Sequence, residues 1–184
     1  MRIQEILRES WQLVKVTPLF IKNVRKTAKN IALDIADDLP QDDTQLGKII
    51  VNLLQRIDVI CGINQTMLIC RAELRPKSAL RGVTSVGCHW TWHDDSAKVY
   101  HHENAYDSHN KNAKLIEMIF TGVVPFAAID WVYTIATNLI HPAEREITIK
   151  PNSEIKMSEI YYGDKVMDCK DATATTFGYY NEIS

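Results

Sequence analysis

Two glutamates separated by one residue, Glu144 and Glu146, stand at the start of an alternating polar and apolar run in the segment HPAEREITIKP. Alternate side chains of an extended strand point to the same side, so Glu144, Glu146 and Thr148 would share one face. Ile147 and Ile149 would lie on the other. Like charges on one face repel each other, so the pair marks either an ordinary solvated strand end or a site at which charge is used.

A third charged residue, Arg71, ends the apolar run MLICRA. Its guanidinium would emerge from a strand that is otherwise buried, where a charge without a partner is costly. A phosphate group would suit it, because the planar fork of arginine matches phosphate oxygens. An ion pair with an acid on a neighbouring strand would serve equally well, so the sequence leaves both interpretations open.

Between these two segments lies GCHWTWHDDSAKVY, which predicts a short strand followed by a helix with acidic residues at its start. Alternation places His89 and Thr91 on one face of this strand. Trp90 and Trp92 occupy the other face, where packing in an aromatic core is the better interpretation.

The elements that must position these residues change character near residue 62. Before it, apolar residues recur at intervals of three and four over Leu46–Ile57, behind the helix-capping sequence DDT. Similar series over Ile3–Val14 and Ile21–Ile35 predict one or two earlier helices, divided near Pro18.

After residue 62, short runs rich in β-formers predict strands, with helical breaks at about 93–102 and 125–138. We therefore predict an α+β fold with a helical segment at 1–61 and a β core at 62–184, packed together as one compact unit.

Composition narrows the class of protein. A chain of 184 residues can bury a substantial core, and its formal net charge of −2 argues against a dedicated nucleic-acid binder. The longest apolar runs are too short and too interrupted to span a bilayer, and the N-terminal sequence lacks the pattern of a signal peptide. We therefore expect a cytoplasmic protein with no membrane association.

The cysteines and histidines show no metal-binding pattern. Cys61, Cys70, Cys88 and Cys169 have no common spacing, which predicts reduced and partly buried thiols. His89 and His93 lie four residues apart, and three more follow at positions 101, 102 and 109. No spacing presents three or four ligands together, so we expect no metal site.

Taken in order, three segments resemble the motifs of ADP-ribosyltransferases. CRAEL resembles the arginine strand of that family, HWTWHDDSAKVY its "STS" strand, and EREITIKPNSEIKM its "ExE" turn, an order often written R-S-E. The last segment is similar to phage members and to eukaryotic arginine-specific members. The resemblance covers about residues 66–161 and rests on three weak motifs in the right order.

The resemblance implies a β core split into two small sheets, with NAD bound as a substrate in the cleft between them. Enzymes of this family break the bond between nicotinamide and ribose and pass ADP-ribose to a macromolecular acceptor. The transition state is an oxocarbenium-like sugar, which a nearby carboxylate stabilises.

By resemblance, Glu146 matches the glutamate that binds a hydroxyl of the nicotinamide ribose. Glu144 matches the general base that draws a proton from an acceptor guanidinium. Arg71, with Ala72 beside it, matches the arginine that binds NAD. Arg81 in LRGV is an alternative, but it lies only eight residues before His89, too close for the intervening strand and loop.

The chain departs from the family in its second motif, where His89, Trp90 and Thr91 stand in place of the "STS" residues. By resemblance, Thr91 matches the last hydroxyl-bearing residue of the "STS" motif. The first serine, which braces the catalytic glutamate, is replaced by His89, and histidine can donate the same hydrogen bond.

Glu144 favours a protein arginine as the acceptor, and a nucleic-acid acceptor stays open. Both a phage effector acting in the host cytoplasm and a bacterial toxin fit the resemblance. Two alternatives remain: a catalytically degenerate transferase fold that binds NAD or a partner without turnover, and an inhibitor of a phage or toxin system that acts by occlusion.

Overall fold

The computed structural model describes residues 14–61, 66–92, 97, 115–169 and 172–178. The chain divides into two units. The first combines Met1–Gln65 with Asp130–Ala143, and the second combines Thr66–Ile129 with Glu144–Ser184. The fold is thus mixed α and β, as predicted. The helix at 131–140 thus groups with the N-terminal helices.

The helices of the first unit are α2 (Pro18–Ile31), α3 (Leu33–Ala36), α4 (Asp43–Cys61) and α6 (Trp131–Ile140). Of these, α2 and α4 bury one apolar side each, whereas residues 134–138 of α6 are all buried. α2 packs against α4 and α6 through side chains at helical spacing. The buried set includes Ile21, Val24, Ala28, Leu46, Ile50, Leu54, Ile57 and Ile135.

Side chains at two helix starts explain where these helices begin. Pro18 opens α2, and the hydroxyl of Thr17 accepts a hydrogen bond from the Phe20 amide at 3.1 Å. In α6, the carboxylate of Asp130 accepts from the Tyr133 amide at 3.0 Å.

Within the described residues, no helix is both long and apolar enough to cross a membrane.

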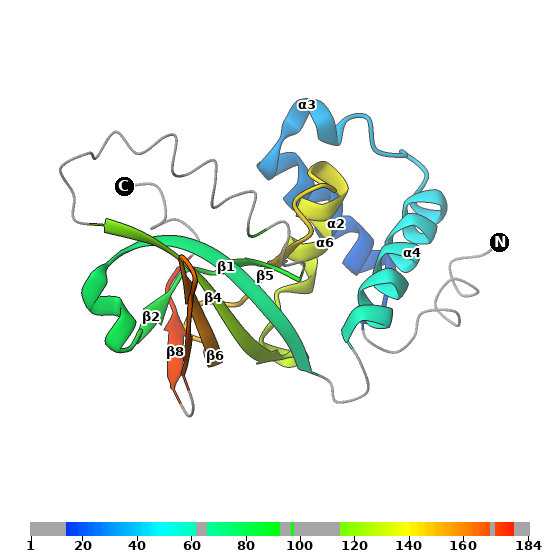
Figure 1. The fold of residues 1–184 in the computed structure, drawn as a ribbon. Coiled ribbons are helices and arrows are strands. Elements are labelled where there is room, and N and C mark those ends of the chain that lie inside the picture. Colours follow the sequence, from blue (N-terminus) through cyan, green and yellow to red (C-terminus); the bar gives the residue numbers. More distant parts are fainter. Residues whose placement is uncertain (1–13, 62–65, 93–96, 98–114, 170–171, 179–184) are drawn as a thin grey trace. The chain divides into compact units, whose positions relative to one another are not determined.

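The second unit is a curled sheet with eight strands among the described residues, hydrogen-bonded in the order β2-β8-β6-β4-β1-β3-β5, with β7 paired to β6 (Figure 1). The elements are β1 (Thr66–Pro76), a 3-10 turn (Lys77–Arg81), β2 (Ser85–Val86), β3 (His89–Thr91), β4 (Leu115–Pro125), a second 3-10 turn (Phe126–Ala128), β5 (Glu146–Thr148), β6 (Glu154–Tyr162), β7 (Lys165–Asp168) and β8 (Thr173–Thr176).

The sheet is curled because its two longest strands, β1 and β4, are themselves curved (Figure 1). β1 and β4 pair antiparallel over their full lengths and form a curved ribbon (Figure 1). β2 is parallel to β8 at one end of the strand order, yet only Gly87 and Cys88 separate it along the chain from β3, near the other end. The strand order therefore bends back on itself around a core that includes Met67, Ile69, Met118, Phe120, Ile147 and Ile155.

The predicted division into two sheets differs from this hydrogen-bond path, which joins all the described strands. The joint between β1 and β3 is a single residue pair, Cys70 with Thr91. β1 thus pairs with β4 along its whole length but with β3 only at Cys70. Beyond it, side chains of β1 bond to the backbone of the segment before and within β3 in place of backbone pairing.

Candidate functional site

The carboxylate of Glu146 lies at the start of β5 and is held by two side chains. β3 and β5 are antiparallel, with His89 opposite Thr148 and Thr91 opposite Glu146. This register puts all four side chains on one face. The Glu146 Oε1 atom lies 2.7 Å from His89 Nδ1, and it accepts a hydrogen bond from the Thr148 hydroxyl at 2.7 Å. The side chains of His89 and Glu146 are 23% and 15% exposed, so the pair is accessible from solvent but largely shielded.

The turn before β5 corrects our expectation for Glu144. Arg145 has φ 50°, a left-handed backbone conformation that interrupts the extended strand. β5 therefore begins at Glu146, and Glu144 lies in the preceding turn. The alternation that would have put Glu144 and Glu146 on one strand face does not extend through Arg145.

Thr91 anchors this turn. Its hydroxyl lies 3.2 Å from the Glu144 carbonyl oxygen and 3.0 Å from that of Arg145. The amide of Trp92 also donates to the Arg145 carbonyl at 3.3 Å. Thr91 is buried, so its bonds to the turn are sheltered from water. The polar side of β3 thus fixes both glutamate positions, through His89 at Glu146 and through Thr91 at the turn that carries Glu144.

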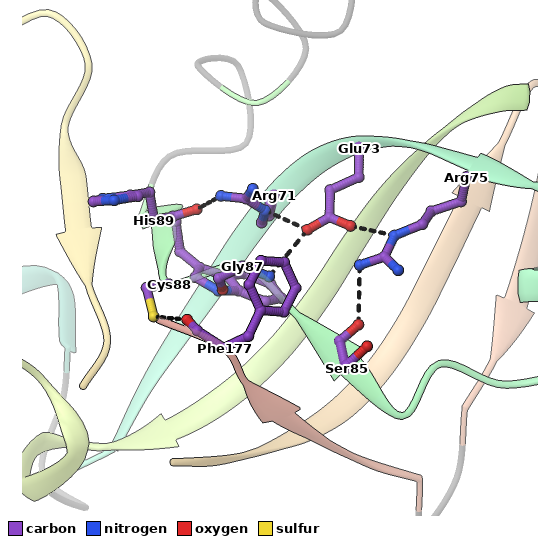
Figure 2. Close-up of polar contacts among 9 residues, drawn as sticks. Arg71, Glu73, Arg75, Ser85, Gly87, Cys88, His89 and Phe177 are labelled. Atoms are coloured by element: carbon purple, nitrogen blue, oxygen red, sulfur yellow. Dashed lines mark hydrogen bonds and ion pairs between the residues drawn. The ribbon is translucent and has the colours of Figure 1, made fainter. Parts of the chain in front are cut away.

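Arg71 forms an ion pair, but with an acid on its own strand. Its Nε atom donates to Glu73 Oε1 at 2.5 Å, and its Nη1 atom donates to the carbonyl oxygen of His89 (Figure 2). The register pairs Cys70, and not Arg71, with Thr91. Arg71 therefore connects to the glutamate site through the backbone of β3, and its side chain belongs to the alternate face of β1.

Glu73 is the centre of this cluster and was not identified from the sequence. It is only 9% exposed and accepts from Arg71, from Arg75 Nε at 2.5 Å and from the Gly87 amide at 3.2 Å. Burial by itself raises the pKa of Glu73, but the two guanidinium groups outweigh that effect and hold the pKa below its ordinary value. The alternation R-x-E-x-R in RAELR could have revealed the cluster, because it places all three charges on one face of a strand.

The remaining predicted residues occupy varied positions. Trp90 is buried, and its indole N–H donates to the Gly87 carbonyl at 2.8 Å, which fits the core-packing interpretation. Ala72 lies opposite Ile119 of β4 and is partly buried. Arg81 is exposed at the end of the first 3-10 turn, on neither β1 nor β3.

The cysteines Cys70, Cys88 and Cys169 are free thiols. Within the ranges that the structure describes, no cluster of three or more histidine, cysteine, aspartate or glutamate side chains could hold a metal ion. His93 and the histidines at positions 101, 102 and 109 lie outside those ranges, as does most of the helix predicted at 93–102.

Comparison with known proteins found no matching family model, no matching curated protein and no matching solved structure.

Proposed function

We propose that this protein is an NAD-dependent mono-ADP-ribosyltransferase that releases nicotinamide and transfers ADP-ribose to a macromolecular acceptor, a protein arginine. One observation carries the proposal. Glu146 is the catalytic carboxylate that the motif order singles out. Its Oε1 atom is hydrogen-bonded to His89 and Thr148, which lie on two adjacent strands. A carboxylate braced by two donors is preorganised to face developing positive charge.

The chemistry assigned to the site needs such a group. Cleavage of the nicotinamide–ribose bond leaves positive charge on the sugar, and a fixed carboxylate stabilises that charge without reorganising during the reaction. Glu146 binds the ribose and stabilises the cation in this scheme. Glu144 accepts the proton of the attacking guanidinium, in a position set by the turn that Thr91 anchors.

The arrangement of strands also supports the proposal. The arginine strand β1, the histidine–threonine strand β3 and the glutamate strand β5 are consecutive neighbours in the sheet. This order brings three motifs that are distant in sequence onto neighbouring strands at one edge of the sheet, where Arg71 contacts the backbone of the strand whose His89 side chain meets Glu146. The ADP-ribosyltransferase fold, with its NAD cleft between two sheets, belongs to this proposal.

The cluster around Arg71 has the charge expected of an anion site. Two guanidinium groups, from Arg71 and Arg75, face one carboxylate, from Glu73, which leaves a formal charge of +1 in a partly buried region. A phosphate of NAD would neutralise this charge.

A second candidate is a degenerate transferase fold that binds NAD or a partner without turnover, or an inhibitor that occludes its target. Two observations favour it: His89 stands in the place of the family's serine, and Arg71 is already paired with Glu73. In this case NAD or partner binding would survive Glu146→Gln, and the wild-type protein would release no nicotinamide.

Labelling of a cell lysate distinguishes these functions and identifies the acceptor. Purified protein is incubated with adenylate-labelled NAD and lysate, beside Glu146→Gln and the matched control Glu154→Gln at an exposed position of β6. We expect labelled protein bands that persist in the control, disappear in Glu146→Gln and are removed by chemistry that cleaves arginine linkages. Label in nucleic acid would change the acceptor class. A folded, NAD-binding wild-type protein that labels nothing in several lysates would favour the second candidate.

A further inference from the structure

The segment Ser85–His89 runs beside β1 without a backbone ladder to it. β1 and β3 share one backbone pair, Cys70 with Thr91, and β2 pairs only with β8 in the part of the chain that the structure describes. Successive residues of an extended chain direct their amide and carbonyl groups to opposite edges. The two edges of this segment can therefore be followed separately.

The edge formed by the even-numbered residues has ordinary backbone partners. The carbonyl oxygen of Thr84 accepts from the Thr175 amide at 2.9 Å, and that of Val86 accepts from the Phe177 amide at 3.0 Å. The Cys88 carbonyl oxygen accepts from the Ile149 amide at 2.8 Å. This edge is a continuous series of backbone bonds.

The other edge is satisfied by side chains of β1. Arg75 Nη2 donates to the Ser85 carbonyl oxygen at 2.9 Å. The Gly87 amide donates to Glu73 Oε1 at 3.2 Å, and Arg71 donates to the His89 carbonyl oxygen. The partners run in antiparallel order, one for every second residue, as the sticks and dashed lines of Figure 2 show. The three charged side chains take the place of a β-ladder, and we call them the side-chain ladder.

We infer that Glu73 is a positioning residue for the glutamate site: through the side-chain ladder, it sets the register of β3 and so holds His89 against Glu146. The catalytic part of this inference rests on the proposed function, whereas the structural part does not. The side chain of Glu73 lies on the opposite face of β1 from that of Cys70, which pairs with Thr91. Glu73 therefore acts through backbone groups: it contacts the Gly87 amide directly and the His89 carbonyl through Arg71.

Glu73 is the central member of the ladder because both arginines depend on it. The Nε atoms of Arg71 and Arg75 bond to different oxygens of its carboxylate, and these bonds aim the outer nitrogens of both groups at the backbone of 85–89. Arginine side chains have many rotamers, and the fixed carboxylate selects one for each. Without this charge, two guanidinium groups on the same strand face would repel each other.

Two variants and a control test the inference. Glu73→Gln keeps the shape of the side chain, but its amide offers one acceptor oxygen instead of two and carries no charge. Arg75→Gln removes the ladder member farthest from His89 and leaves the ion pair of Arg71 with Glu73. Glu154→Gln is the matched control. The readouts are amide exchange at Gly87, the ¹⁵N chemical shifts of the His89 ring, and steady-state nicotinamide release.

For Glu73→Gln we expect exchange at Gly87 to rise about tenfold, as follows from the loss of a charge-assisted hydrogen bond. We also expect a shift of the His89 Nδ1 resonance away from its wild-type position, and a fall in kcat larger than any rise in KM. Arg75→Gln should change the His89 resonance less, and Glu154→Gln should change none of the readouts.

An unchanged His89 Nδ1 resonance in folded Glu73→Gln would overturn the inference, even if the protein were less stable. If Glu73→Gln does not fold, equal shifts of the His89 resonance in Arg75→Gln and in Glu154→Gln would overturn it. A wild-type protein that releases no nicotinamide would instead refute the proposed function, and the exchange and resonance readouts would still decide the role of Glu73.

Discussion

Replacement of His89 tests whether its contact with Glu146 orients the carboxylate. His89→Phe keeps a ring of similar size but removes Nδ1, so Glu146 Oε1 retains the Thr148 hydroxyl as the donor described above. His89→Asn is the matched variant, because the side-chain amide nitrogen of asparagine can occupy nearly the place of Nδ1. The two variants therefore differ mainly in whether a donor faces Glu146.

The size of the effect follows from the burial of the pair. A hydrogen bond to a charged group contributes about 1.5–3 kcal/mol when it is buried, and an exposed ion pair contributes about 0.2–1 kcal/mol. The side chains of His89 and Glu146 are 23% and 15% exposed, which places their contact between these limits. We expect a coupling of about 1.5 kcal/mol, which corresponds to a roughly tenfold change in an equilibrium or rate constant.

Two assays measure this value independently. A double-mutant cycle of His89→Phe and Glu146→Gln, followed by urea unfolding, gives the coupling in the folded protein without reference to activity. Nicotinamide release should fall about tenfold in kcat for His89→Phe and much less for His89→Asn. A coupling near zero, together with equal activities of the two variants, would refute the claim that His89 braces Glu146.

Three further predictions concern stability. The pKa of Glu73 is lowered in the folded protein, so its carboxylate stabilises the fold at pH values above the unfolded pKa. This contribution is lost as the pH falls through the folded pKa. Glu73→Gln should therefore make the free energy of unfolding in urea depend less on pH in the acid range. Thr91→Val, which removes the hydroxyl that anchors the turn before β5, should lower the free energy of unfolding by about 1–2 kcal/mol, whereas Thr91→Ser should retain most of it. Gly122→Ala would put a methyl group 2.7 Å from Ile155 Cγ2 and should cost about 1–3 kcal/mol in thermal unfolding, whereas Gly178→Ala, at an open position, should be neutral.

Much of the secondary structure could be predicted from periodicity. The spacing of apolar residues identified α2 and α4, and the buried residues of α4 include Leu46, Ile50 and Ile57. Short runs of β-forming residues identified the strand that carries Arg71, and alternation supported those that carry His89 and Glu146. These signals are local, since one apolar face repeats along each element.

The parts that could not be predicted depend on contacts between distant segments or on single backbone angles. The left-handed conformation of Arg145 is not encoded by its residue type, and it places Glu144 in a turn instead of on the strand. The bonds of Arg71, Glu73 and Arg75 to the backbone of the segment 85–89 required knowing that this segment and β1 run side by side without a backbone ladder. Similarly, the grouping of α6 with the N-terminal helices comes from tertiary packing.

The release of nicotinamide from NAD by the purified protein, compared with Glu146→Gln, tests the central claim most directly. We predict that the wild-type protein and the control Glu154→Gln release nicotinamide at the same rate, and that Glu146→Gln lowers kcat by about 10²–10³, the size of effect expected from loss of one preorganised electrostatic group. Release by Glu146→Gln at the wild-type rate, with both proteins folded, would contradict the assignment of Glu146 as the catalytic carboxylate.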